Sequence, residues 1–175
     1  MEYRELGEAE ISGRLLDGCE RRQEVVKCWR KLDGLWAVAH DPFIDQWSGE
    51  ERAELIRALR DTVHAGGVVF AAFSGNALKG FASVDPNPLG SQGKYLDLSN
   101  LHVSEEMRGL GIGRRLFLMC VSWARERGAG KLYISAHSAV ETQAFYRAMG
   151  CVEAAEYSAW HVKKEPYDCQ LEYVL

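Results

Sequence analysis

The 175-residue sequence has no apolar run long enough to span a bilayer. Its first residues, M-E-Y-R-E-L-G-E, lack the basic and then apolar pattern of a secretory signal. Basic residues are not in excess, because 21 Lys and Arg stand against 25 Asp and Glu, and the formal net charge is −4. These absences argue against a membrane protein and a nucleic-acid-binding protein, and we expect a cytoplasmic location.

Several motifs of site chemistry are also missing. The five cysteines are scattered without a C-x-x-C pair, which argues against a disulfide framework or a zinc site and predicts buried thiols. No histidine spacing suggests a metal, and the hydrolase motif G-x-S-x-G is absent. The glycines fit neither G-x-G-x-x-G nor a G-K-[ST] nucleotide loop.

The composition is that of one globular domain. Hydrophobic residues make up 47% and charged residues 26% of a chain that can bury one good core. No repeat, low-complexity tract or linker divides it. Predicted strands and helices are mixed, with an antiparallel first half. We therefore predict a single domain, residues 1–175, of the α+β or mixed α/β class.

The first third predicts a β-hairpin. Apolar segments flank Asp33-Gly34, a two-residue turn signal, and place the hairpin at about Glu24 to His40. It brings Trp29 and Trp36 together, either as ordinary packing or as part of a ligand pocket. An edge strand is expected earlier, from Tyr3 to Leu6.

The next segment predicts a loop, a helix and two strands. Residues 41–47, D-P-F-I-D-Q-W, are expected to form the loop. Ser48 and Glu51 make a capping box that opens the helix. The strands run from Gly67 to Phe73 and from Ala77 to Val84.

The most informative stretch follows. A strand-like run, Y-L-D-L-S-N-L-H-V (Tyr95 to Val103), precedes the turn R-G-L-G-I-G (Arg108 to Gly113). A helical pattern then begins, with apolar residues Leu116, Phe117, Cys120, Val121 and Ala124. The first turn of a helix has unpaired N–H groups and a positive dipole end, and glycines let an anion approach. With Arg108, Arg114 and Arg115 nearby, the turn predicts a pyrophosphate site.

The last third continues with a short strand, Lys131 to Ser135. Ser138 and Glu141 fit a capping box for a helix that leads into F-Y-R-A-M-G-C, Phe145 to Cys151. The chain is then irregular until an alternating segment, Asp168 to Leu175, which predicts a closing strand.

The R-x-x-G-x-G turn, with the strands and helices from Tyr95 to Cys151, resembles the GNAT superfamily of N-acyltransferases, which bind acetyl-CoA. The resemblance implies a twisted mixed β-sheet, splayed at its central strands and flanked by about four helices. Residues of about 95–151 would form the acetyl-CoA-binding core, and residues of about 1–66 the acceptor side.

The resemblance also implies which residues hold acetyl-CoA. Backbone amides of Leu101 and Val103 would bind the pantetheine arm and polarise the thioester carbonyl. The pyrophosphate would lie on the turn residues Arg108, Gly109, Leu110, Gly111, Gly113 and Arg114. Many members have an Asn where this chain has Ala139, and Ser138 and Thr142 are the candidates to replace it.

Acetyl transfer to an amine needs a group that removes a proton, because an amine with a pKa of about 10 is protonated at neutral pH. The resemblance implies Asp97 for this role, as a base or as an anchor for the amine. His102 is a rival base, because its usual pKa of about 6.5 suits the role. Strict alternation, however, puts Asp97 on one face of the strand and His102 on the other, so His102 is interpreted as structural unless a bulge intervenes.

Tyr146 matches the superfamily tyrosine that protonates the leaving thiolate, with ordinary aromatic packing as the alternative. We therefore predict an N-acetyltransferase that transfers acetyl from acetyl-CoA to a primary amine of a small cationic molecule, such as an antibiotic, a polyamine or an amino-acid derivative. A protein lysine or N-terminal acceptor and a non-catalytic acyl-CoA sensor are the alternatives. The resemblance also favours a homodimer.

Overall fold

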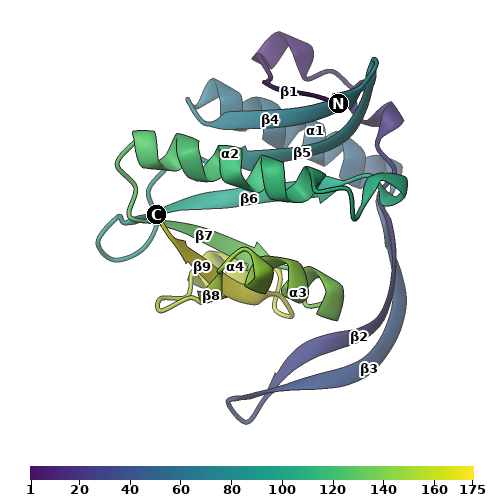
Figure 1. Ribbon diagram of the computed structural model, residues 1–175. Coiled ribbons are helices and arrows are strands. Elements are labelled where there is room, and N and C mark those ends of the chain that lie inside the picture. Colours follow the sequence, from purple (N-terminus) through teal and green to yellow (C-terminus); the bar gives the residue numbers. More distant parts are fainter.

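The computed structural model describes residues Met1 to Leu175 and contains a seven-stranded sheet and a separate two-stranded hairpin (Figure 1). The sheet order is β1-β4-β5-β6-β7-β9-β8. Its strands are β1 (Glu2–Glu5), β4 (Val68–Ser74), β5 (Ala77–Val84), β6 (Tyr95–Val103), β7 (Lys131–Ala136), β8 (Val152–Glu153) and β9 (Cys169–Val174). The hairpin is β2 (Arg22–Leu32) and β3 (Leu35–Gln46). The helices are α1 (Gly49–His64), α2 (Ile112–Glu126), α3 (Val140–Ala148) and α4 (Ala159–Lys164).

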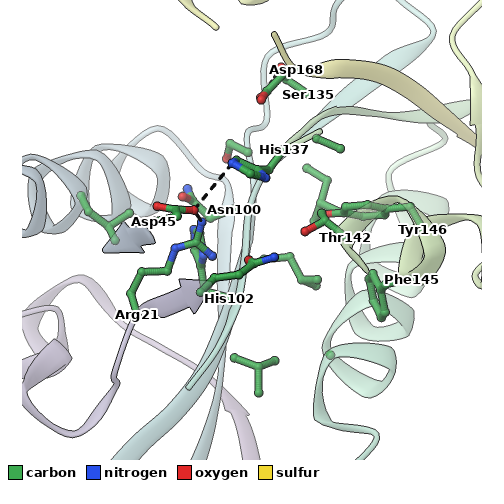
Figure 2. Close-up of a pocket in the computed structure, with 18 of the residues that line it drawn as sticks. Arg21, Asp45, Asn100, His102, Ser135, His137, Thr142, Phe145, Tyr146 and Asp168 are labelled. Carbon is green, nitrogen blue, oxygen red and sulfur yellow. Dashed lines mark hydrogen bonds and ion pairs between the residues drawn. The ribbon is translucent and has the colours of Figure 1, made fainter. Parts of the chain in front are cut away.

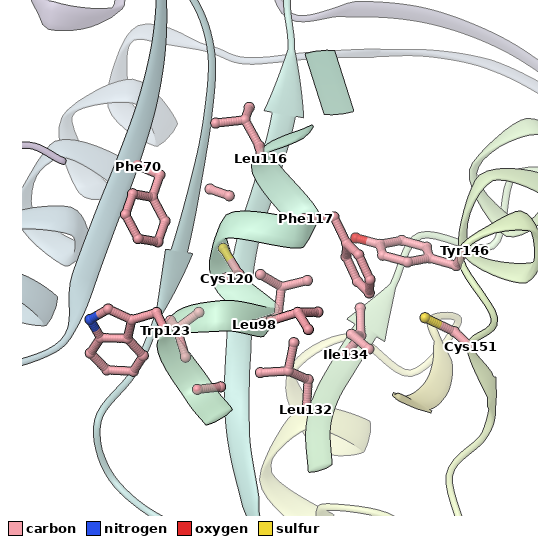
Figure 3. Packing of buried hydrophobic residues seen from close by; sticks show 14 of the residues in the cluster. Phe70, Leu98, Leu116, Phe117, Cys120, Trp123, Leu132, Ile134, Tyr146 and Cys151 are labelled. Carbon is pink, nitrogen blue, oxygen red and sulfur yellow. The ribbon is translucent and has the colours of Figure 1, made fainter. Parts of the chain in front are cut away.

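Helices pack on both faces of the sheet. Buried side chains of α2, such as Phe117 and Cys120, meet Leu98 of β6 and Tyr146 of α3 in the main core (Figure 3). On the opposite face, α1 buries Leu59 in a second core against β4 and β5. The predicted mixed α+β class with about four helices is confirmed.

The two central strands separate part of the way along their length. β6 and β7 are parallel, but only Tyr95–Asp97 pairs with Lys131–Tyr133. Beyond these residues β6 continues to Val103 without a neighbour on that side. The predicted splay of the sheet is therefore confirmed, and one edge of β6 is left free.

A bulge at Ser99 changes the alternation of β6. Val84 of β5 pairs with Leu98, whereas the preceding Ser83 pairs with Asn100, so Ser99 is an extra residue in the ladder. The residues on the α2 face are Leu96, Leu98, Leu101 and Val103. Because the period shifts by one, Asp97 and His102 lie on the same opposite face. The prediction that they face opposite ways is wrong.

The predicted hairpin is confirmed but is longer than expected. β3 runs on to Gln46, so the prediction of a loop at residues 41–47 is wrong. Pro42 is tolerated because it lies at the register shift between Val25 and Lys27, where the ladder is already interrupted. Both strands are thereby long enough for their base to reach the diverging ends of β6 and β7.

The far part of the hairpin is fixed to the C-terminal half of the chain (Figure 1). The N–H of Trp29 donates to the Ser138 carbonyl at 2.8 Å, and the Arg147 guanidinium lies 4.4 Å from the Trp29 ring. Trp36 donates from Nε1 to Glu153 at 3.1 Å. The two tryptophans therefore contact α3 and β8, where both line a small cavity of about 100 Å³, instead of packing only within the hairpin.

Two predictions in the last third are wrong. Ser138 does not cap α3, because its hydroxyl accepts from Arg30 at 2.6 Å and Ala139 occupies the N-cap without a side-chain bond. The segment after Cys151 is not irregular throughout, since it contains β8 and α4.

None of the helices combines the length and apolarity that a bilayer span needs. All five cysteines are buried free thiols, as predicted.

Candidate active site

A cleft of about 1570 Å³ lies where β6 and β7 diverge. Its lining comes from α1, the turn before α2, α3, α4 and the base of the β2–β3 hairpin. Figure 2 shows Tyr146 and Phe145 of α3 on one side of the cleft and His102 and Arg21 on the other. Pockets for one small ligand usually measure about 300–1000 Å³, so this cleft is large enough for two substrates.

The glycine-rich turn leads directly into α2. Gly109 and Gly111 have φ angles of +78° and +80°, which favour glycine, and Gly111 is the N-cap of α2. The first backbone hydrogen bond of the helix runs from Arg115 N–H to the Gly111 carbonyl at 3.1 Å. The N–H groups of the preceding helical residues lack helical partners, so the turn offers donors to an anion at the cleft.

Most residues predicted to bind the cofactor line the cleft: Leu101, Val103, Arg108, Gly109, Gly111, Gly113 and Arg114. Leu110 is not among the lining residues, and it is 66% exposed. Arg115 also lies elsewhere, with its guanidinium 4.2 Å from the Tyr3 ring. The arginines at the cleft end of the turn are therefore Arg108 and Arg114.

The free edge of β6 supplies backbone donors to the same cleft. Ser104 N–H donates towards β5, to the Lys79 carbonyl at 2.9 Å. Successive residues of a strand alternate in hydrogen-bonding direction, so the amides of Leu101 and Val103 point to the opposite edge. The Val103 carbonyl points there as well, because it accepts from Arg108 Nε at 3.2 Å.

Asp97 and His102 both line the cleft from the face opposite α2. His102 packs against the rings of Trp47 and Phe81, and its buried Nδ1 has no hydrogen-bond partner. Burial, with the charges of Arg21 and Arg108, holds the pKa of His102 well below its usual 6.5. Its imidazole is thus neutral at physiological pH, and the bulge removes the geometric reason for treating it as purely structural.

The Asp97 side chain is buried and bonded to a residue that the sequence did not single out. Its Oδ2 lies 3.0 Å from Nε2 of His161 on α4, and its Oδ1 is buried without a partner. The sequence offered little signal for this contact, because α4 has six residues and its helical period is too short to detect.

Tyr146 lies across the cleft on α3. Its ring packs against Phe117, with ring centroids 6.4 Å apart, and the residue is only 6% exposed. Burial raises the pKa of Tyr146 well above its usual value, so the hydroxyl keeps its proton at neutral pH. The residue is thus both a member of the core and a wall of the cleft.

A charged cluster at the base of the hairpin was also not predicted (Figure 2). Arg21 forms an ion pair with Asp45, and Nε2 of His137 lies 3.9 Å from Asp45 Oδ2. Arg21 Nε is buried without a hydrogen-bond partner. The long β3 brings Asp45 here, so the signal was hidden by the incorrect loop assignment.

Ala139 has a structural explanation. It is fully buried against Val25 and Cys28 and forms a bridge with Cys28 of β2. The close approach of β2 leaves little room for a larger side chain at this position. Of the two proposed replacements for the missing Asn, Thr142 lines the cleft and Ser138 does not.

Comparison with known families explains this combination of a splayed sheet and a glycine-rich turn. The model of the acetyltransferase (GNAT) family matches residues 32–151. The chain belongs to the GNAT acetyltransferase family. Comparison with curated protein sequences finds no match.

Solved structures of GNAT acetyltransferases have the same fold over the full chain. Nourseothricin acetyltransferase superposes with a TM-score of 0.70 and 18% identity, covering 98% of this chain and 95% of that one. A candidate streptothricin acetyltransferase from Bacillus anthracis str. Ames, in complex with acetyl coenzyme A, superposes with a TM-score of 0.70 and 18% identity. The match covers 99% of this chain and 96% of that one. PaiA N-acetyltransferase from Thermoplasma acidophilum, in complex with coenzyme A, superposes with a TM-score of 0.61 and 15% identity. The match covers 99% of this chain and 98% of that one.

The GNAT match ends at Cys151, so α4 and β9 lie outside it. The glycine-rich turn, β6 and Tyr146 lie inside. His161, which contacts Asp97, belongs to the part of the chain that the family model does not describe.

Proposed function

We propose that this GNAT protein transfers an acetyl group from acetyl-CoA to a primary amine of a small cationic molecule. The observation that carries the proposal is the free edge of β6, which lies between the glycine-rich turn and Tyr146 in one cleft. Asp97 lies nearer the start of the same strand. Acetyl-CoA and the acceptor can therefore meet between Asp97 and the free edge.

The residues at the turn fit acetyl-CoA. A pyrophosphate needs several donors and close backbone approach, and added Cβ atoms at Gly109 and Gly111 would meet nothing within 4 Å. Arg108 and Arg114 add positive charge, and the amides of Leu101 and Val103 would bind the pantetheine arm. When bound, acetyl-CoA supplies the activated thioester. Crystallised family members with acetyl coenzyme A or coenzyme A support this assignment.

We expect Gly111→Val to lower the affinity for acetyl-CoA by about tenfold or more. The φ of +80° at Gly111 is strained for a β-branched residue, by roughly 1–2 kcal/mol or more, so the turn shifts and its donors are misplaced. Isothermal titration calorimetry measures the effect. Leu110→Val in the same turn is the matched control, since Leu110 does not line the cleft. Equal affinities of the two variants would contradict the assignment.

In the proposed reaction, Asp97 removes a proton from the acceptor amine so that the nitrogen lone pair can attack the thioester carbonyl. The amides of Leu101 and Val103 donate to the carbonyl oxygen as it gains negative charge. Tyr146 then donates its phenolic proton to the departing sulfur. As the amide forms, its nitrogen loses a second proton, which returns through water to the Tyr146 oxygen. Asp97 releases its own proton to solvent, so one proton is released for each protonated amine consumed.

A cationic acceptor is supported by the charge of the cleft. The acidic lining residues are Glu24, Asp45, Glu51, Glu54, Asp61, Asp85, Asp97, Glu105, Glu141, Glu165 and Asp168, against the basic residues Arg21, Arg22, Arg108, Arg114 and Lys164. Glu51, Glu54 and Asp61 recur at helical spacing, so one exposed face of α1 presents an acidic stripe. Two of the similar structures are named for nourseothricin and streptothricin, which supports an antibiotic of this class.

Glu54→Lys tests the acidic stripe. We expect KM for a cationic acceptor to rise about three- to tenfold while kcat changes little, because an exposed charge acts on binding and is screened by salt. Steady-state kinetics at low and high ionic strength measure this. Glu50→Lys makes the same change on α1 away from the cleft and should leave KM unaltered. A KM that ignores both substitutions would remove this support for a cationic substrate.

The function itself is tested with a panel of amines. Streptothricin-type and aminoglycoside antibiotics, polyamines, lysine derivatives and lysine-containing peptides are each incubated with acetyl-CoA. Release of the CoA thiol is followed, and mass spectrometry identifies the acetylated product. We expect turnover with a small polycationic amine. Turnover with peptides alone would favour a protein acceptor. Thermal stabilisation by acetyl-CoA without any turnover would favour an acyl-CoA sensor.

A further inference from the structure

We propose that His161 is the positioning residue of Asp97. It would hold one carboxylate oxygen so that the other is presented to the acceptor amine. This inference rests on the proposed acetyl transfer and deepens it, because it adds a residue from α4 to the acid–base machinery. His161 lies beyond residues 32–151, the part described by the family model.

The contacts of His161 define its orientation. The residue is buried, with Nε2 3.0 Å from Asp97 Oδ2 and Nδ1 2.8 Å from the Ser158 hydroxyl. An ionised carboxylate only accepts hydrogen bonds, so Nε2 carries the proton that is shared with Asp97. The Ser158 hydroxyl can either donate to Nδ1 or accept from it, so the proposal requires only the proton on Nε2.

Ser158 is itself anchored to the sheet. Its N–H donates to the Tyr133 hydroxyl at 2.9 Å, and this hydroxyl donates to Gln170 of β9. The Tyr133 ring also packs on His161, with ring centroids 5.0 Å apart. The imidazole is thus held directly by Tyr133 of β7 and by Ser158 at the N-cap of α4, while Gln170 of β9 fixes the Tyr133 hydroxyl. A surface histidine that met Asp97 by chance would not need this support.

The two carboxylate oxygens of Asp97 have different environments. Oδ2 is bonded to His161, whereas Oδ1 is buried and has no partner. A buried acceptor without a hydrogen bond is costly, and an incoming N–H group would remove that cost. Since Asp97 lines the cleft, the geometry assigns to the amine the oxygen that has no other partner, which the amine reaches once neighbouring side chains move to expose Oδ1. In the step, the N–H bond of the amine breaks and an O–H bond forms at Oδ1, while His161 keeps its Nε2 proton.

Other titratable groups face this pair and must be separated from it. Tyr133 comes from β7, and Asp168 and Glu165 come from the segment between α4 and β9. Burial raises the pKa of Asp168 to about 6, against the opposing hydrogen bond from Ser135. Asp168 would therefore titrate in the pH range of an activity assay, and Asp168→Asn is needed as a control.

The test compares His161→Phe with His161→Gln. Phe keeps a ring but removes the donor, and we expect kcat to fall roughly 10- to 100-fold, the effect of losing one hydrogen bond to a charged group, with KM changed less than about threefold. Gln retains an N–H donor and should recover most of kcat. The acidic limb of the pH profile of kcat/KM should move to higher pH in His161→Phe, because the carboxylate loses a bond that stabilises its charge. The acidic limb should stay at its original pH in His161→Gln. The shift caused by His161→Phe should also occur when both variants carry Asp168→Asn, which removes the titration of Asp168.

Nitrogen-15 NMR of the imidazole gives a readout that does not depend on acetyl transfer. We expect a protonated, hydrogen-bonded Nε2 at His161 in the free protein, altered by Asp97→Ala. An Nε2 without a proton would overturn the proposal, as would an unmoved pH profile in His161→Phe, or a folded His161→Gln as inactive as His161→Phe. If no amine is acetylated at all, the proposed function fails, and the NMR result alone decides whether His161 orients Asp97.

Discussion

Asp97→Asn is expected to lower kcat by about two to four orders of magnitude, the range that a general base contributes. The amide has nearly the shape of the carboxylate and can still bond to His161, but it cannot accept a proton from the amine. The acceptor then remains almost wholly protonated at neutral pH, because its unperturbed pKa is near 10. Initial rates with saturating acetyl-CoA and a cationic amine measure the loss.

Asp85→Asn is the matched control for this substitution. Asp85 lines the same cleft, and its backbone N–H donates to the Asp97 carbonyl at 2.9 Å, so the same chemical change occurs nearby. We expect its kcat to remain within about threefold of the unaltered enzyme, the scale of ordinary surface substitutions. If Asp97→Asn instead raises KM and leaves kcat intact, Asp97 anchors the amine. His102, with its neutral imidazole, would then be the next base to replace.

Tyr146→Phe should give the second-largest effect, a fall in kcat of roughly 10- to 100-fold. The expected loss is smaller than for the base, because a thiol of pKa about 8.5 is a moderate leaving group even without an acid. Since burial raises the pKa of Tyr146, the proton remains available to donate throughout the neutral range. The activity that Tyr146 supports should therefore not decline between about pH 7 and pH 9.

Only the hydroxyl is removed, so packing against Phe117 is retained and the melting temperature should change little. Tyr173→Phe is the control, because Tyr173 packs against the same Phe117 ring and does not line the cleft. An unchanged kcat in Tyr146→Phe would support the alternative, that this tyrosine is only a packing residue.

The sequence was sufficient where the decisive interactions are local. β6 was predicted from Tyr95 to Val103 and has those bounds, since its apolar pattern is dense and a glycine-rich turn follows. α1 begins at the predicted capping box, with Glu51 N–H donating to the Ser48 hydroxyl at 3.2 Å. The placement of Tyr146 and the turn in one cleft followed from the family resemblance.

Tertiary contacts decided the features that could not be predicted. The bulge at Ser99 depends on the register with β5, which no single strand encodes. The Ser138 hydroxyl accepts a hydrogen bond from Arg30, a residue far away in sequence, instead of capping α3 as expected. α4 is too short to show a helical period, so His161 could not be connected with Asp97 before the chain was folded.

The extra residue in β6 has a consequence for how this enzyme can change over time. A gain or loss of one residue near Ser99 would exchange the apolar face and the cleft face over half of the strand. Either Asp97 or His102 would then point towards α2. Length changes in this nine-residue segment are therefore incompatible with keeping both side chains in the cleft unless a compensating change restores the phase. Amino-acid changes that alter acceptor specificity can instead accumulate in α1, α4 and the hairpin, while the length of β6 stays constant.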